Sequence, residues 1–319
     1  MEMSMANQVT MDNKEIFLAR TQGFCAGVGR AVKIVEQALK KYGPPIYVFH
    51  EIVHNTYVVK DFINRGVIFV EEIGHVPLGE HLIFSAHGVS PDIIHEAKER
   101  NLICIDATCP LVKKIHRLAI EFSQRGYQII LVGHKGHQEI RGTSGYIDPK
   151  LLHYVQKLDD VVNLALAPNK PITYLTQTTL SVDDTREIIA ALKMKYPQLK
   201  EPSTDNICFA TQKRQDAVKE LAKMVDVMIV CGSPNSSNSN RLKETGEKAG
   251  VVSYIIDDES QLNIGMLKRK NKVGISSGAS VPWIIVERLV DKIQTAYPGT
   301  IVHNLESESP KKAFPLPEI

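Results

Sequence analysis

The chain has 319 residues, of which 43% are hydrophobic and 23% are charged, and its formal net charge is +2. This length and composition are typical of a soluble globular protein with two or three lobes. Lysine and arginine are spread along the sequence, which argues against a nucleic-acid partner, and no apolar run approaches the ~20 residues that a membrane span needs. Because residues 1–13 are polar and lack the features of a secretion signal, we expect a cytoplasmic protein.

Strands and helices are predicted to alternate in the first third of the chain. Apolar and β-branched runs predict strands at 16–19, 46–49, 67–70 and 82–84. Cys25 stands at the corner between the first strand and a helix that ends at Gly43. The second strand ends in a polar segment that contains His54, and the last strand ends in a polar segment that contains His87.

The second third of the chain repeats this order. Strands are predicted at 102–105, 127–132, 151–155 and 172–175. Cys109 follows the first of these strands, and Pro110 opens a helix with one apolar face. The second strand ends in a polar segment with His137 and Glu139, and the last strand ends near Thr178.

The final third repeats the order again. Strands are predicted at 227–230, 251–256 and 273–275. Cys208 precedes a helix, and the first of these strands ends in a serine-rich segment with Ser236, Ser237 and Asn238. The last strand ends near Ser280, before another helix.

The spacing within the three thirds is nearly constant. From the cysteine to the first polar segment it is 29, 28 and 30 residues, and from the cysteine to the second polar segment it is 62, 69 and 72 residues. A fixed order at a long period indicates duplicated supersecondary units. Since each unit alternates strand and helix, we predict an α/β fold of three similar lobes with small, mainly parallel sheets around a pseudo-threefold axis.

The repeat also sets the expected lobe boundaries. Lobe 1 is predicted over 26–109, lobe 2 over 110–206 and lobe 3 over 207–293. The two ends of the chain, 1–25 and 294–319, would add a terminal strand and an extended strap that begins at Glu306.

The five cysteines divide into two kinds. An odd number in a chain without a secretion signal argues against a disulfide framework. Cys104 and Cys231 lie inside apolar strands, so we predict that both are buried as small hydrophobic side chains. Cys25, Cys109 and Cys208 lie at corners before helices, where the positive end of the helix dipole favours the thiolate.

The repeat would bring all the polar segments to one cavity, because ligands bind beyond the carboxyl ends of parallel strands. Three thiolates on one wall could hold Zn²⁺ or an iron–sulfur cluster. The gaps of 84 and 99 residues lack the short chelating loop that is usual for zinc. A cubane is large enough for ligands from three lobes, although iron–sulfur proteins also often use clustered cysteines. With three thiolates, one iron would keep an open position and act as Lewis acid and electron donor.

Several of these residues also have an ordinary structural interpretation. A single histidine more often has a structural role than a ligand-binding one, whereas His54, His87 and His137 fall at equivalent corners. Glu139 could be a solvated loop acid or a proton donor in the cavity. The serine-rich run could be a flexible loop or an anion site at a helix N-terminus. The histidines with a structural interpretation are His50, His75, His81, His95, His116, His153 and His303.

Beyond these patterns, the sequence resembles one family, the 4-hydroxy-3-methylbut-2-enyl diphosphate reductases of the methylerythritol phosphate route to isoprenoids. The resemblance runs from about Phe17 to the helix after Ser280. The motifs that carry it are Gly23-Phe24-Cys25-Ala26-Gly27-Val28, Val53-His54-Asn55, Ser85-Ala86-His87-Gly88-Val89, Asp106-Ala107-Thr108-Cys109-Pro110, Gly136-His137-Gln138-Glu139, Thr176-Gln177-Thr178-Thr179-Leu180-Ser181 and Asn235-Ser236-Ser237-Asn238-Ser239-Asn240.

The resemblance implies a trefoil of three lobes around one oxygen-sensitive [4Fe-4S] cluster, with Cys25, Cys109 and Cys208 as its ligands. The hydroxyl of the substrate would bind the open iron, and two electrons and protons would remove it as water. The products would be isopentenyl and dimethylallyl diphosphates. Ferredoxin or flavodoxin would supply the electrons.

The resemblance also implies roles for the polar residues. Glu139, Thr178 and His137 would form the catalytic group, with Glu139 as the proton relay. Because none of the residues assigned to the diphosphate is lysine or arginine, we predict in addition that substrate binding weakens as the pH rises from about 6 to 8.5 and the histidines lose their protons. The diphosphate would lie among His54, His87, Ser236, Ser237, Asn238 and Ser280, with His137 as the third histidine of the pocket.

Two other functions remain as alternatives. A non-redox dehydratase would use the open iron only as a Lewis acid, but it should have an arginine for a substrate carboxylate. An iron–sulfur sensor or binding module usually has a nucleic-acid-binding or partner-binding segment, and neither is visible in the sequence.

Overall fold

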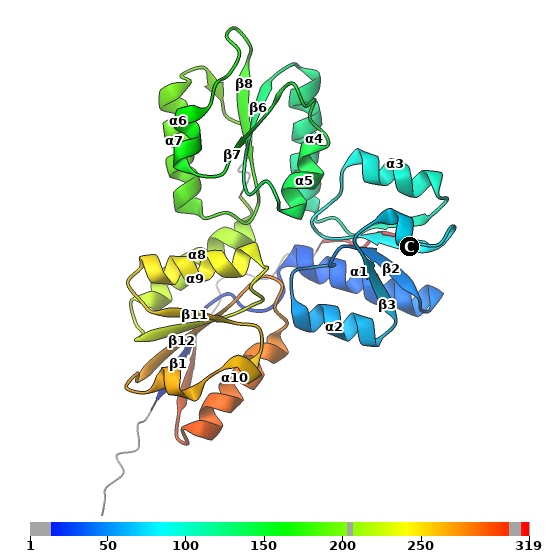
Figure 1. Ribbon diagram of the computed structural model, residues 1–319. Helices are drawn as coiled ribbons and strands as arrows, with labels where there is room; N and C mark the ends of the chain where they lie inside the picture. The colour runs from blue at the N-terminus through cyan, green and yellow to red at the C-terminus, as the bar shows by residue number, and fades with distance from the viewer. Residues whose placement is uncertain (1–13, 203–206, 306–313, 319) are drawn as a thin grey trace, which may run out of the picture.

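The computed structural model describes residues 14–202, 207–305 and 314–318, which form three α/β lobes (Figure 1). Each lobe has one parallel sheet with helices packed on it, so the predicted fold of three similar lobes is confirmed. The strands are β1 (Glu15–Leu18), β2 (Ile46–Phe49), β3 (Val67–Val70), β4 (His81–Phe84), β5 (Ile103–Asp106), β6 (Gln128–Val132), β7 (Leu152–Val155), β8 (Ile172–Thr176), β9 (Leu199–Lys200), β10 (Val227–Cys231), β11 (Ser253–Ile256), β12 (Lys272–Ser277) and β13 (Ile301–Asn304).

The α-helices connect these strands in the order that parallel pairing requires. They are α1 (Ala26–Tyr42), α2 (Thr56–Asn64), α3 (Pro91–Glu99), α4 (Pro110–Gln124), α5 (Gln138–Ser144), α6 (Leu158–Asn163), α7 (Val182–Lys195), α8 (Phe209–Ala222), α9 (Ser237–Lys248) and α10 (Trp283–Ala296). Short 3₁₀ turns lie at Ile73–His75, Glu259–Gln261 and Ile264–Leu267.

The spatial order of the strands repeats from lobe to lobe. The sheets run β3-β2-β4-β5, β7-β6-β8-β9 and β11-β10-β12-β1-β13. In each sheet, the strand that leads to the first polar segment lies between the other two strands of its unit. The terminal strands β1 and β13 pair with each other and complete the third sheet, since β1 also pairs with β12. The lobe boundaries at 109/110 and 206/207 stay predictions.

Amphipathic helices cover these sheets. In the first lobe, Ile34, Val35 and Ala38 of α1 are fully buried against Ile46 and Val48 of β2. Each of the isoleucine and valine side chains contributes roughly 1.5–3 kcal/mol on burial. This packing holds α1 over the sheet and thereby fixes the position of the corner that precedes it.

The two cysteines predicted to be buried behave differently. Cys231, the last residue of β10, is fully buried, and this prediction is confirmed. The prediction for Cys104 was wrong, because Cys104 is exposed on β5. β5 is the edge strand of the first sheet, and three of its four residues are exposed there, with Ile105 alone buried.

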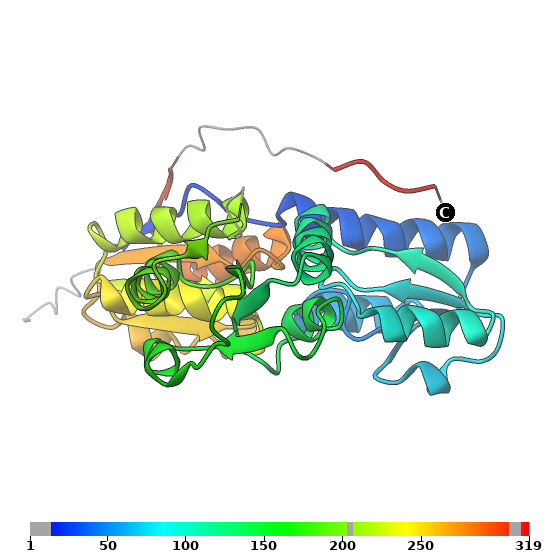
Figure 2. The same cartoon turned by 90° about the horizontal axis from the view of Figure 1, so that it is seen from above.

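The C-terminal residues 314–318 lie along α1, as the view from above shows (Figure 2). There Nε of Arg30 donates a hydrogen bond to the carbonyl of Pro315 at 2.9 Å. Of the predicted strap, 306–313 lies outside the described residues. Within the described part of the chain, no helix has the length and apolar character to cross a membrane.

Candidate functional site

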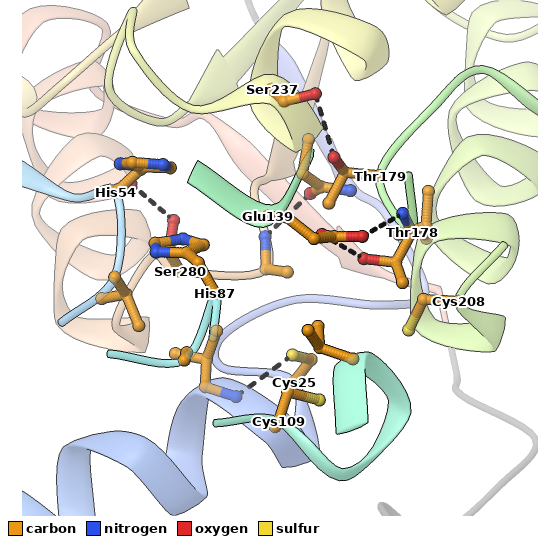
Figure 3. A pocket seen from close by; sticks show the side chains of 18 of the residues that line it. Cys25, His54, His87, Cys109, Glu139, Thr178, Thr179, Cys208, Ser237 and Ser280 are labelled. Carbon is orange, nitrogen blue, oxygen red and sulfur yellow. Dashed lines mark hydrogen bonds between the residues drawn. The ribbon is translucent and has the colours of Figure 1, made fainter. Parts of the chain in front are cut away.

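The cavity where the three lobes meet encloses about 720 Å³, its open mouth included (Figure 3). Every residue that the sequence predicts for the site lines this cavity. These residues are Cys25, His54, His87, Cys109, His137, Glu139, Thr178, Cys208, Ser236, Ser237, Asn238 and Ser280. They come together because all the strands are parallel, so that the corners at their carboxyl ends meet. Among the described residues, none of the lining side chains belongs to lysine or arginine.

The three cysteines occupy equivalent positions. Each is the N-cap residue of a helix, α1, α4 or α8. The backbone N–H of each cysteine also donates to a carbonyl in a second polar segment. These bonds are Cys25 to Ala279 at 3.0 Å, Cys109 to Ala86 at 3.0 Å and Cys208 to Thr178 at 3.1 Å. The bonds tie each cysteine corner to a corner that lines the cavity. We call the side of the cavity with the three cysteines the sulfur wall, and the side with the histidines, Glu139, Thr178 and the serine-rich segment the polar wall. The bonds thus hold the two walls in fixed positions relative to each other.

The protonation of the cysteines departs from the sequence prediction. Burial raises the pKa of the Cys109 thiol to about 12, and the neighbouring Cys25 and Cys208 raise it further, against the backbone N–H groups of the helix. Burial likewise raises the pKa of Cys208. The backbone N–H groups at the two helix starts do lower these pKa values, as the sequence predicts, but burial outweighs them, so the thiol form is favoured overall. A bound cation would reverse this balance.

The sulfur wall fits a group larger than one ion. Gly27 leaves room there, since a Cβ at this position would lie 2.5 Å from Sγ of Cys109 and 4.0 Å from Sγ of Cys25. Within residues 14–202, 207–305 and 314–318, no three His, Cys, Asp or Glu side chains lie close enough together to hold a single metal ion. Three thiols from three lobes with this spacing suit a cluster better than zinc.

Glu139 is a buried carboxyl group in the middle of the polar wall. It lies in the first turn of α5, and it is 3% exposed, so the alternative of a solvated loop acid was wrong. Its Oε1 accepts from the backbone N–H of Thr178 and its Oε2 accepts from the Thr178 hydroxyl, both at 2.7 Å. Burial nevertheless raises the pKa of Glu139 to about 7, against these two hydrogen bonds. The group can therefore hold or release a proton near neutral pH.

The three histidines of the polar wall pack against one another. The rings of His54 and His87 stack with their centroids 4.1 Å apart, and His137 meets them edge-on at 5.6 and 5.9 Å. Burial, followed by the charges of His54 and the other neighbouring histidines, lowers the pKa of His87 well below its ordinary value. Burial also lowers the pKa of His137 to about 3, with His54 adding to the effect.

The lowered pKa values change the expected charge of the pocket. His137, with its pKa of about 3, is neutral from pH 6 to 8.5, and burial likewise favours the neutral form of His87, so an anion would not find two imidazolium groups there. Neutral imidazole can still donate one hydrogen bond. Nδ1 of His137 accepts from the backbone N–H of Glu139 at 3.2 Å, which leaves the proton on Nε2.

The serine-rich segment completes the polar wall, beside Glu139 and the three histidines. Ser236 is the N-cap residue of α9, and the hydroxyl of Ser237 accepts from the hydroxyl of Thr179 at 3.0 Å. The Oδ1 of Asn238 accepts from Ala279 N–H at 2.9 Å, while its Nδ2 is buried and has no partner. Together with the helix N-terminus, this free donor suits an anion.

Glu51 was not predicted from the sequence, although it stands three residues before His54. Its Oε2 lies 2.9 Å from Nδ1 of His54 and accepts from Nδ2 of Asn235 at 2.9 Å. The carboxylate thus fixes the orientation of the His54 ring and joins the first lobe to the third. The nearness of Glu51 to the His54 motif was the available signal, but its contact with Asn235 depends on the assembly of the lobes.

A family model described as LytB protein matches residues 16–294. The chain is 48% identical to a 4-hydroxy-3-methylbut-2-enyl diphosphate reductase of Ralstonia nicotianae, over 97% of this chain and 95% of that protein. It is 49% identical to the protein of that name from a Polaromonas species, over 95% of this chain and 91% of that protein.

Solved structures give the same result for the fold. The E-1-hydroxy-2-methyl-but-2-enyl-4-diphosphate reductase of Plasmodium falciparum superimposes with a TM-score of 0.92 and 38% identity, over 96% of each chain. A second structure, an (E)-4-hydroxy-3-methyl-but-2-enyl diphosphate reductase described as the terminal enzyme of the non-mevalonate pathway, has a TM-score of 0.63 and 33% identity, over 88% of this chain and 99% of that chain. The lobes are thus arranged as the trefoil that the sequence resemblance implies.

Proposed function

The chain belongs to the LytB family, and from this premise we infer that it reduces 4-hydroxy-3-methylbut-2-enyl diphosphate in the cavity between its lobes. The reaction is the last step of the methylerythritol phosphate pathway. The substrate takes up two electrons and two protons, of which one proton leaves with the hydroxyl group as water and the other is added to the allylic carbon skeleton, and the products are isopentenyl and dimethylallyl diphosphates. The observation that carries the assignment of the site is that three cysteine corners and a buried, proton-holding carboxyl group line one cavity.

The family implies an iron–sulfur cofactor, and we propose one [4Fe-4S] cluster held by Cys25, Cys109 and Cys208. When bound, such a cluster supplies electrons one at a time and an iron with an open position that acts as a Lewis acid. The missing side chain of Gly27 and the origin of the three thiols in three lobes support this assignment.

The polar wall is proposed to hold the diphosphate with neutral groups. Its donors are the free amide of Asn238, the hydroxyls of Ser236 and Ser237, and the imidazoles, and the Ser280 hydroxyl would join them by turning from the carbonyl of His54, to which it donates. The N-terminus of α9 adds its partial positive charge. Because the side chains are fixed by hydrogen bonds before the substrate arrives, little conformational freedom is lost on binding.

Glu139 is proposed to deliver a proton to the leaving hydroxyl. With a pKa of about 7, a large fraction of Glu139 carries a proton at neutral pH. Thr178 fixes the carboxyl orientation through two hydrogen bonds. Departure of hydroxide from carbon is far easier when it leaves as water, so the placement of this proton is what the side chains contribute to bond cleavage.

A dependence of turnover on pH follows from Glu139. Since the raised pKa keeps the acid protonated below about 7, kcat should be constant on the acid side and should fall tenfold per pH unit well above 7. Steady-state rates measured anaerobically between about pH 6 and 9 check this prediction. A kcat that does not change over this range would contradict the role of Glu139 as the proton donor.

Glu51→Gln is expected to weaken diphosphate binding by roughly tenfold, which corresponds to the loss of one hydrogen bond to a charged group. Oε2 of Glu51 lies 2.9 Å from Nδ1 of His54 and also accepts from Asn235, and its charge strengthens both contacts, so glutamine should hold the His54 ring less firmly toward the anion. Titration calorimetry with inorganic pyrophosphate checks the prediction. Glu15→Gln, which alters the matched pair with His303 on the far side of the third lobe, should leave the Kd unchanged. Equal Kd values for the unchanged protein, Glu51→Gln and Glu15→Gln would contradict the role of Glu51.

The electron donor is proposed to be a one-electron carrier such as ferredoxin or flavodoxin, and the cytoplasm stays the predicted location. The proposed function is tested by anaerobic reconstitution with iron and sulfide, followed by an assay with the allylic diphosphate alcohol and a chemical reductant. Formation of both diphosphate products at the expense of two electrons each supports the assignment. Loss of water without reductant would indicate a dehydratase, and cluster formation without any turnover would indicate a sensor.

A further inference from the structure

A fully buried arginine lies behind the sulfur wall and has no part in the reaction described above. Arg214 projects from α8, six residues after Cys208, and it is 1% exposed. Its guanidinium donates to the carbonyls of Thr21 at 3.1 Å, Ser277 at 2.8 Å and Gly23 at 2.6 Å. Its Nε is buried and has no hydrogen-bond partner.

The positive charge of Arg214 is not balanced by a carboxylate. In the part of the chain that the structure describes, all the acceptors of this guanidinium are neutral backbone carbonyls. Burial lowers the pKa of Arg214, and the groups that oppose this effect are the thiols of Cys25 and Cys208. A buried cation without a counter-charge is strongly destabilising, so a protein that keeps one has an anion nearby in its working state.

The backbone bonds of Arg214 also connect the two cysteine corners. Thr21 and Gly23 precede Cys25, and Ser277 ends β12. The backbone N–H of Gly23 donates in turn to the hydroxyl of Ser277 at 3.1 Å. One side chain on the helix that begins after Cys208 therefore holds the loop that presents Cys25.

We propose that Arg214 has two roles toward the cluster. As a positioning residue it joins the corners of Cys25 and Cys208, and as a buried cation it stabilises the negative charge of the bound cluster, most of all when the cluster is reduced. This inference depends on the proposed function, because it requires the cluster. A cluster with three thiolate ligands carries net negative charge, and each added electron increases it. A fixed cation that is bonded to the loop before Cys25 and lies on the helix after Cys208 stabilises the reduced form more than the oxidised form and so raises the reduction potential.

The charge and the backbone bonds can be separated with two substitutions. Arg214→Met keeps much of the volume and removes both the charge and the hydrogen bonds, whereas Arg214→Lys keeps the charge and can make only part of the bonds. The three proteins are reconstituted anaerobically, and the midpoint potential of the cluster is measured by spectroscopic titration. Iron release to a chelator and the melting temperature with and without the cluster are measured on the same samples.

The proposal predicts that Arg214→Met lowers the ratio of reduced to oxidised cluster about tenfold at a fixed potential, a shift of roughly 59 mV for a one-electron couple. The Met protein should also release iron about tenfold faster and gain less thermal stability from the cluster than the unchanged protein. Arg214→Lys should stay close to the unchanged protein in potential.

Three results would overturn the proposal. The first is an unchanged potential in Arg214→Met with a complete cluster. The second is an equal shift in the Met and Lys proteins, which would assign Arg214 to the backbone bonds alone. The third is failure of both variants to fold even without iron, which would make Arg214 a folding residue. If the unchanged protein took up no cluster, the proposed cofactor would fail as well, and this outcome is distinct from the other three.

Discussion

Replacing Glu139 by glutamine should lower kcat by at least about 100-fold while the cluster content stays the same. Glutamine has nearly the same shape, its one oxygen can still accept from the Thr178 N–H and its amide can donate to the Thr178 hydroxyl, but it has no acidic proton to donate. General acid catalysis typically contributes 10²- to 10⁴-fold, which sets the expected size of the loss. The measurement is anaerobic turnover with the allylic diphosphate alcohol, normalised to iron content.

A control is available for this substitution. Glu121 is exposed on α4 and pairs with Arg125, so Glu121→Gln removes the same functional group outside the cavity and should leave kcat unchanged. If Glu139→Gln turned over at the normal rate with a full cluster, the proton would have to come from another group. The descending limb of the pH profile should also disappear in the residual activity of Glu139→Gln.

Cys109→Ser is the second substitution with a large expected effect, namely loss of the cluster and of all measurable reduction. Serine is nearly isosteric, but its hydroxyl is a far weaker ligand for iron than a thiolate. Cys109 is also the thiol whose sulfur lies against Gly27 on the sulfur wall. Iron and sulfide analysis together with the visible absorption after reconstitution checks the prediction.

The matched control for the cysteine is Cys104→Ser. Cys104 lies on β5, in the strand that leads to the Cys109 corner, but it is exposed and does not line the cavity. Its replacement should leave iron content and activity as they are. Equal iron content in the Cys109 and Cys104 variants would remove Cys109 from the ligand set.

The positions of the three cysteine corners could be predicted from the sequence because they depend on local signals. Apolar runs end in polar turns, and helices follow, as Pro110 shows for Cys109. The near-constant spacing then implied that the corners meet, because parallel strands present their carboxyl ends at one edge. This information is contained in the order of residues along the chain.

The properties that arise from packing could not be predicted in this way. The exposure of Cys104 depends on which strand is at the sheet edge, and the pKa of Glu139 depends on how completely the lobes exclude water from it. The raised pKa of Cys109 has the same origin, since burial outweighs the helix N-terminus. The balance between desolvation and local dipoles is a property of the assembled molecule.

Contacts between residues of different lobes also could not be predicted from the sequence patterns. Glu51 meets Asn235 only because the first and third lobes adjoin. Arg214 lies on α8, and a single charged residue on a helix gives no periodic signal that it is buried. Both residues became visible as candidates only once their partners in space were known.

The central claim is that three cysteines from three lobes hold a four-iron cluster with one distinct iron facing the polar wall. Mössbauer spectroscopy of the anaerobically reconstituted protein tests it most directly. The expected result is about four irons per chain, about three in one environment and about one in another, with the minor component alone changing when the alcohol substrate is added. Four equivalent irons that do not respond to the substrate, or about one metal ion per chain, would contradict the claim.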